Sequence, residues 1–179
     1  MAGDLTLYIG NKNYSSWSMR SWVLMRQTGI GFDEVMVRFD SFAPDSAFKR
    51  SLFAVTPTGK VPALQTVIDG TTLVIWDTLA IAEYLAERFP ALHLWPAQAA
   101  TRARARSVSA EMHSGFAALR SHFPFNVEAN LPQVGQRVLA EQAAVRADVS
   151  RITQLWSDCL GASGGPFLFG GFGIADAFF

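Results

Sequence analysis

The 179-residue sequence has little of three things: cysteine, histidine and net charge. Cys159 is its one cysteine, so the chain forms no intrachain disulfide and has no cysteine-rich zinc site. The three histidines are not spaced as metal ligands, and we expect no bound metal. Basic and acidic residues both number 15, which argues against nucleic acid or an acidic membrane surface as the main partner.

The sequence also lacks a long apolar run and a recognisable targeting segment. No stretch of 18 apolar residues occurs, and "MAGDLTLYIG" does not have the basic-then-apolar pattern of a signal peptide. We therefore expect a soluble, cytoplasmic protein. Half of the residues are hydrophobic and 17% are charged, so the chain has enough apolar material for a proper core.

The first half of the chain mixes strand and helix patterns. "LTLYIG" alternates apolar residues as a half-buried strand does, and Asp69-Gly70 is typical of a tight hairpin turn. The predicted elements are, in order, a strand over 5–10, a helix from about 16 that stops at Gly29, a strand over 32–40, an irregular segment with one short helix over 41–59, a hairpin over 60–76 and a helix over 77–89.

The second half of the chain shows no strand pattern. After the proline-containing linker "FPALHLWPA", apolar residues recur at three- and four-residue steps in two segments, 98–123 and 134–160. These predict two long amphipathic helices, the second of which carries Val149 and Trp156 on its apolar stripe and is broken by "GASGGP". "FGIADAFF" predicts the opening of a further helix. The fold class is therefore a small α/β domain followed by an all-α domain.

The segment "NYSSWSM" places serines where the first strand passes into the first helix. Backbone N–H groups at a helix N-terminus lack partners within the helix, and the helix dipole favours negative charge there. An anionic group is therefore expected near Ser15 and Ser16.

Two further segments have both a structural and a functional interpretation. Pro62 in "GKVPAL" begins a strand, lies at an edge or forms a cis bond; a cis bond would leave the backbone of Val61 for an extended, peptide-like ligand. In "WDT", Asp77 or Thr78 caps the following helix. In the functional interpretation, the same cap binds the carboxylate and ammonium of an amino-acid head group.

Taken together, these segments resemble the cytosolic glutathione S-transferase family. "YSSWSMRSWVLMRQTGI", "TPTGKVPAL", "WDTLAIAEYLAERFP" and "GPFLFGGFGIADAFF" all have family counterparts, so the resemblance extends over essentially the whole chain. The double serine is most similar to the zeta-type and related bacterial serine enzymes. The resemblance implies a thioredoxin-like glutathione-binding domain over 1–88, a linker over 89–97 and a helical domain over 98–179.

The resemblance also implies an activity and its residues. The chain would activate glutathione as a thiolate and conjugate it to an apolar electrophile, with glutathione as co-substrate and no other cofactor. The implied residues are Ser15 and Ser16 at the thiolate, Lys60, Val61, Asp77 and Thr78 at the rest of glutathione, and Trp17, Met112 and Phe116 at the electrophile pocket. Other classes of the family use a tyrosine as the hydrogen-bond donor to the thiolate, and Tyr8 and Tyr14 flank the serines. Ser15 fits the spacing of the family motif better. The family also implies a homodimer.

Two positions depart from the family pattern. Trp17 stands where zeta-type enzymes carry cysteine, which weakens the alternative of a glutathione-dependent cis–trans isomerase of the maleylacetoacetate type. Gly173 stands at a helix cap that is usually serine or threonine. A non-catalytic glutathione-binding or regulatory protein is the other alternative. Because family members continue beyond the position of Phe179, we expect the helical domain to be incomplete in this sequence.

Overall fold

The structure is a computed structural model that describes residues 4–41 and 43–179. The chain divides into two compact units, which we call unit 1 (through Leu92) and unit 2 (His93–Phe179). Among the described residues, no helix is both long and apolar enough to cross a membrane.

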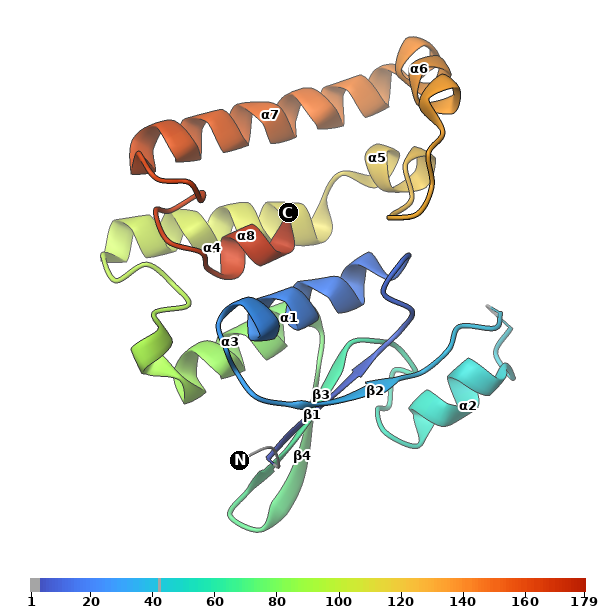
Figure 1. The fold of residues 1–179 in the computed structure, drawn as a ribbon, viewed down its shortest axis with the longest axis vertical. Helices are drawn as coiled ribbons and strands as arrows, with labels where there is room; N and C mark the ends of the chain where they lie inside the picture. The colour runs from blue at the N-terminus through green and yellow to red at the C-terminus, as the bar shows by residue number, and fades with distance from the viewer. Residues whose placement is uncertain (1–3, 42) are drawn as a thin grey trace. The chain divides into compact units, whose positions relative to one another are not determined.

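Unit 1 contains a four-stranded mixed sheet in the order β2-β1-β3-β4 (Figure 1). β1 pairs in parallel with β2 and antiparallel with β3, which pairs antiparallel with β4. The thioredoxin-like arrangement expected from the sequence is confirmed. Its elements are β1 (Leu5–Ile9), α1 (Ser16–Gln27), β2 (Asp33–Met36), α2 (Ala47–Phe53), β3 (Ala63–Ile68), β4 (Thr71–Trp76), α3 (Thr78–Arg88) and the short 3₁₀ helix η1 (Pro90–Leu92).

The core of unit 1 lies between the sheet and the two helices α1 and α3, which pack together (Figure 1). β1 buries every second residue, as its alternation predicts. The largest fully buried side chains from the sheet and these helices are Leu7, Ile9, Leu24, Met25, Leu64, Ile81 and Leu85. This core fixes the ends of β1 and α1, and of β4 and α3, relative to one another.

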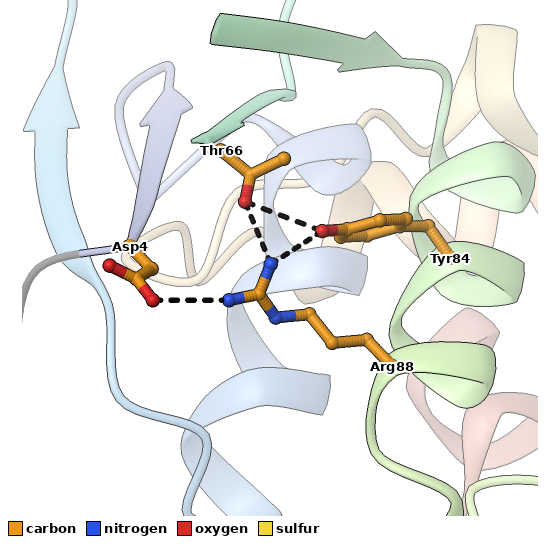
Figure 2. Close-up of polar contacts among 4 residues, drawn as sticks. All are labelled: Asp4, Thr66, Tyr84 and Arg88. Atoms are coloured by element: carbon orange, nitrogen blue, oxygen red, sulfur yellow. Dashed lines mark hydrogen bonds and ion pairs between the residues drawn. The ribbon is translucent and has the colours of Figure 1, made fainter. Parts of the chain in front are cut away.

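A polar cluster also fastens α3 to the sheet (Figure 2). The Arg88 guanidinium donates to Thr66 Oγ1 at 2.9 Å and to Tyr84 Oη at 2.6 Å, and lies 3.4 Å from an Asp4 carboxylate oxygen. Tyr84 Oη also donates to Thr66 Oγ1 at 3.3 Å. Thr66 is buried, so these bonds satisfy a hydroxyl inside the unit and set the position of α3.

The hairpin prediction is confirmed, whereas the strand predicted over 32–40 is too long. Asp69 and Gly70 both have positive φ, 51° and 76°, and join β3 to β4. β2 is an edge strand that ends at Met36, and its Val35 is exposed. Phe39 lies beyond the strand, since its backbone N–H donates to the side chain of Asn11 and not to a neighbouring strand.

Unit 2 is helical, as predicted. Its helices are α4 (Ala99–Ser114), α5 (Ala117–His122), α6 (Pro132–Glu141), α7 (Ala143–Ser163) and α8 (Ile174–Phe178). The predicted helix opening in "FGIADAFF" is confirmed as α8, where Asp176 accepts from the backbone N–H groups of Leu168 and Gly173. A side chain at Gly173 would lie 2.9 Å from Leu94 O, which explains the glycine at this cap.

The prediction of two long helices is wrong for both, because each is interrupted and forms two shorter helices. The first breaks between α4 and α5 at Gly115, where a Cβ would lie 2.7 Å from Glu111 O. The second breaks at Gln142, between α6 and α7. There the Arg146 side chain donates to Leu139 O and Ala140 O, two carbonyls at the end of α6 that a continuous helix would satisfy itself.

The apolar stripe predicted on the second long helix is also partly wrong. Val149 and Trp156 are exposed, and Leu155 is fully buried instead. Polar contacts also hold α7 to α4 and α5. Arg151 forms a two-bond ion pair with Glu111 of α4, and Asp148 accepts from the Leu119 N–H of α5 at 2.9 Å.

Candidate functional site

A pocket of about 610 Å³ lies in unit 1. Six residues singled out from the sequence line it: Ser15, Ser16, Trp17, Lys60, Val61 and Asp77. The other lining residues are Gly10, Asn11, Tyr14, Phe39, Phe48 and Lys49. The pocket therefore joins four parts of the chain that are distant in sequence: the β1–α1 loop, Phe39 with Phe48 and Lys49, the turn before β3, and the turn before α3.

Asn11 shapes the loop that carries Ser15. Its backbone carbonyl accepts from the N–H groups of Tyr14 at 3.3 Å and Ser15 at 2.9 Å. Its side-chain Oδ1 accepts from the Phe39 N–H at 2.9 Å. One residue thus sets the turn into α1 and connects this turn to the segment after β2.

Ser15 is the residue before the first turn of α1, and its hydroxyl does not cap the helix. It donates instead to Ser18 Oγ at 2.8 Å, and the buried Ser18 Oγ also accepts from the Gly10 N–H at 2.9 Å. No acidic residue lies in the first turn of α1. The helix N-terminus at the pocket is therefore not neutralised by a carboxylate of its own first turn.

Val61 and Pro62 are joined by a cis peptide bond, one of the alternatives left open by the sequence. β3 begins just after them, at Ala63. Val61 lines the pocket, and among the described residues its backbone N–H and C=O make no hydrogen bond. These groups are available to an extended ligand.

Asp77 caps α3 and also lines the pocket. Its Oδ1 accepts from the Leu79 N–H at 2.8 Å, and its φ of 75° turns the chain sharply from β4 into the helix. Thr78 is the first residue of α3, is buried and is not part of the lining. The structure thus brings Asp77 to the pocket and leaves the Thr78 side chain in the core.

Two lysines lie at the same pocket. Lys60 is exposed. Lys49 Nζ donates to Gly59 O at 2.8 Å and so holds the turn that precedes Lys60. The sequence patterns did not point to Lys49, Asn11, Phe39 or Phe48. The role of Lys49 could not be predicted from neighbouring residues, because it depends on a backbone carbonyl ten positions away.

The carboxylate of Asp40 holds the segment that carries Phe48. It accepts from the N–H groups of Ala47 at 2.9 Å and Phe48 at 3.2 Å, at the start of α2. Desolvation is the largest single influence and raises the pKa of Asp40, but the backbone hydrogen bonds together outweigh it and hold the pKa below its ordinary value. The carboxylate is therefore ionised at neutral pH.

The three residues assigned to an electrophile pocket are not equivalent. Trp17 lines the pocket of unit 1, and its ring centroid lies 4.3 Å from the Arg20 guanidinium carbon. Met112 and Phe116 belong to unit 2, and both are buried there. Met112 accepts from Arg120 through its carbonyl and its sulfur, and Phe116 occupies the left-handed turn between α4 and α5.

The part of the chain that the structure describes contains no group of three or more His, Cys, Asp or Glu residues that could hold a metal ion. The polar groups at the pocket are hydroxyls, two lysines, the Asp77 carboxylate and the N-terminus of α1.

Residues 14–88 match the family model described as "Glutathione S-transferase, N-terminal domain". This part of the chain is therefore similar to the glutathione-binding half of glutathione S-transferases. The match covers every residue that lines the pocket except Gly10 and Asn11. No curated protein matches the chain in sequence.

Solved glutathione transferases have the same fold over nearly the whole chain. One from the Antarctic clam Laternula elliptica is 22% identical, with a TM-score of 0.68, and the match covers 99% of this chain and 75% of that one. A homologue from Burkholderia with bound glutathione is 28% identical, with a TM-score of 0.61 and coverage of 97% and 77%. One from Sulfitobacter, also with bound glutathione, is 24% identical, with a TM-score of 0.66 and coverage of 98% and 78%.

Proposed function

We propose that this chain is a glutathione transferase of the serine type, which binds glutathione in the pocket of unit 1 and activates it as a thiolate. The observation that carries the proposal is the position of Ser15, whose hydroxyl lies at the pocket, at an N-terminus without a first-turn carboxylate. The glutathione bound to the Burkholderia and Sulfitobacter homologues supports the choice of ligand.

In the proposed mechanism, the Ser15 hydroxyl turns from Ser18 to the glutathione sulfur. A free thiol has a pKa of about 8.5, and a helix N-terminus lowers it. A hydroxyl donated to the sulfur favours the charged form further, because hydrogen bonds to ions are stronger than neutral ones. Ser18 keeps its bond from the Gly10 N–H when Ser15 turns away, so no buried polar group is left unsatisfied there.

The rest of glutathione is assigned to the remaining polar groups of the pocket. The Val61 backbone would pair with the cysteinyl unit, since its N–H and C=O make no bond to other described residues. Asp77 would face the ammonium of the γ-glutamyl unit, with the backbone at Thr78 close to its carboxylate. Lys60 would reach a glutathione carboxylate. Ser16 is assigned a supporting role beside Ser15.

The finer assignments rest on the family resemblance. We propose that the protein is cytoplasmic and homodimeric, is most similar to the zeta-type and related bacterial enzymes, and needs no cofactor besides glutathione as co-substrate. The second substrate would be an apolar electrophile, which the thiolate attacks. Catalysis would come from thiolate stabilisation and from holding both reactants together.

The experiment compares Ser15→Ala with Ser16→Ala and the unaltered protein. Glutathione affinity is measured by calorimetry, and turnover is measured with 1-chloro-2,4-dinitrobenzene over a range of pH. We expect Ser15→Ala to keep the affinity for glutathione within a few-fold and to lower turnover about tenfold or more at neutral pH. The rise of turnover with pH should shift to higher pH, because the thiolate loses one charge-assisted hydrogen bond and the pKa of the thiol increases.

Two results would contradict the proposal. If the unaltered protein does not bind glutathione, glutathione is not the ligand of this pocket. Unchanged turnover and an unchanged pH profile in Ser15→Ala would transfer the role to Ser16, Ser18 or Tyr14, and Ser16→Ala already tests the first of these.

A further inference from the structure

Ser18, in the first turn of α1, is fully buried and uses its hydroxyl in an unusual way. A serine inside a helix often donates its O–H to the carbonyl four residues before it, as Ser107 and Ser114 do in α4. Ser18 makes no such bond in the part of the chain that the structure describes. Its oxygen instead accepts twice, from the Gly10 N–H at 2.9 Å and from the Ser15 O–H at 2.8 Å.

This arrangement leaves the hydrogen of the Ser18 hydroxyl unused. A hydroxyl has two lone pairs and one hydrogen. Both lone pairs of Ser18 Oγ accept a hydrogen bond, whereas no atom of the described residues accepts its hydrogen. Closing the end of β1 needs only the bond from the Gly10 N–H. The bond from Ser15 and the unused hydrogen are therefore not explained by the fold.

The position of Ser18 limits how it can act on a ligand. The lining of the pocket in unit 1 includes Ser15 and Gly10 but not Ser18. A Cβ at Gly10 would lie 3.2 Å from Ser15 Oγ, so the missing side chain leaves room for Ser15 beside the end of β1. Ser15 is the lining side chain to which Ser18 is hydrogen-bonded. An effect of Ser18 on a bound molecule therefore passes through Ser15.

From this geometry we infer that Ser18 is a positioning residue, which donates its hydroxyl hydrogen to Ser15 Oγ when Ser15 donates to the glutathione thiolate. This inference rests on the proposed function and adds a residue to the same site. The change needs only the rotation of two O–H bonds. The Ser15 hydrogen moves from Ser18 to the sulfur, and the Ser18 hydrogen moves to Ser15 Oγ. The two oxygens stay in hydrogen-bond contact, and the Gly10 N–H stays bonded to Ser18.

The resulting series of hydrogen bonds runs from the Gly10 N–H through Ser18 and Ser15 to the sulfur. Hydrogen bonds in such a series polarise one another, so Ser15 is a stronger donor when its own oxygen accepts from Ser18. A thiolate gains more from a stronger donor than a neutral thiol does, because hydrogen bonds to ions are the stronger ones. Ser18 thus lowers the pKa of bound glutathione without contacting it.

The experiment measures the pKa of bound glutathione in Ser18→Ala from the ultraviolet absorbance of the thiolate. We expect this pKa to rise by about 0.5 to 1, and turnover of 1-chloro-2,4-dinitrobenzene at neutral pH to fall about three- to tenfold. The affinity for S-methylglutathione, which has no thiol to ionise, should stay within about twofold of that of the unaltered protein. A general distortion of the pocket would weaken the binding of S-methylglutathione as well.

Three further variants complete the test. In a chain that already carries Ser15→Ala, Ser18→Ala should not change the pKa of bound glutathione further, since Ser18 acts through Ser15. Ser21→Ala is the matched control and should leave this pKa and turnover unchanged. Ser21 is buried in the same helix, and its hydroxyl has no partner among the described residues. If Ser18→Ala does not fold, Ser18→Cys replaces it, because a thiol is a weak donor of similar size and should also raise the pKa.

The failure of the inference differs from the failure of the proposed function. An unchanged pKa of bound glutathione in the folded Ser18 variant overturns the inference. So does an equal rise with and without the Ser15 hydroxyl, or a matching loss of affinity for S-methylglutathione. If the unaltered protein does not bind glutathione, or binds it without lowering the pKa of its thiol, the proposed function itself is overturned, and the inference with it.

Discussion

At the residue scale, Asp77 combines a structural contact with a position in the pocket. Its Oδ1 caps α3 by accepting from the Leu79 N–H, while the residue also lines the pocket of unit 1. An asparagine can make the same cap but carries no charge, and both residues tolerate positive φ better than most. Substitution at this one position can therefore separate helix capping from recognition of an ammonium group.

We expect Asp77→Asn to keep the free energy of unfolding within about 0.5 kcal/mol and to weaken glutathione binding about tenfold or more, because a charged hydrogen bond is lost but the cap remains. Asp77→Ala should weaken binding similarly and also lose about 1 kcal/mol of stability with the cap. Calorimetry and urea denaturation measure the two quantities. Wild-type affinity in Asp77→Asn would show that the carboxylate is a helix cap alone.

At the element scale, the interruptions of the helices in unit 2 depend on local backbone contacts. Gly115 ends α4 where the chain passes close to the Glu111 carbonyl, so a methyl group there meets backbone that cannot move aside cheaply. Gly161, in contrast, lies inside α7, where an added methyl group would have no atom within 4 Å outside its own stretch of helix. The same substitution at the two glycines should therefore have opposite effects.

Gly115→Ala is expected to lower the free energy of unfolding by about 1–3 kcal/mol, because the added methyl forces a backbone shift. Gly161→Ala is expected to raise it by up to about 1 kcal/mol, since alanine loses less conformational entropy in a helix than glycine does. Urea denaturation followed by circular dichroism gives both values. Stabilisation by Gly115→Ala would mean that α4 and α5 form one continuous helix in solution.

At the scale of the whole molecule, the ion pair between Glu111 of α4 and Arg151 of α7 makes the free energy of unfolding depend on acidic pH. Arg151 Nε and Nη2 lie 2.5 and 2.9 Å from the two Glu111 carboxylate oxygens. The hydrogen bond from Arg151 is the main cause that holds the pKa of Glu111 below its ordinary value of 4.5. Because the carboxyl titrates at lower pH in the folded chain, its stabilisation is complete above that value and is lost as the pH falls through the folded pKa.

We expect Glu111→Gln to lower the free energy of unfolding at pH 7 by about 0.5–1 kcal/mol, since both side chains are more than a third exposed and solvent screens the pair. The difference from the unaltered protein should shrink as the pH is lowered below 4.5 and in high salt. Glu141→Gln, at the exposed end of α6, is the control. A loss that is independent of pH would assign the effect to packing and not to charge.

Glutathione binding should slow hydrogen exchange in unit 1 and not in unit 2, because every residue that lines the proposed glutathione pocket lies in unit 1. At a glutathione concentration of about 100 times Kd, amides that exchange only through ligand-free states should exchange up to about 100-fold more slowly. We expect this protection over 10–17, 39–49, 59–62 and 77–79, as measured by hydrogen exchange and mass spectrometry. Protection confined to 93–179 would place the ligand outside this pocket.

Much of the fold could be predicted because its signals are local. The alternation of residues 5–9, the Asp69-Gly70 turn and the helical pattern that ends before Gly29 are each decided by residues within a few positions. The pocket was less predictable. Ser15, Val61 and Asp77 were indicated by segments that resemble a family, whereas Asn11, Phe39 and Lys49 reach the pocket through contacts between segments 10 to 28 positions apart.

The sequence by itself determined the order of strands and helices, the division into a mixed first half and a helical second half, and the segments worth attention. Tertiary structure decided where helices stop and which side chains meet. Apolar periodicity continues unchanged through Gln142, but the α6 carbonyls find their partners in the Arg146 side chain, and the chain turns there. A hydrogen-bonding group accepts whichever donor the fold brings to it, and this choice has no signature in the spacing of neighbouring residues.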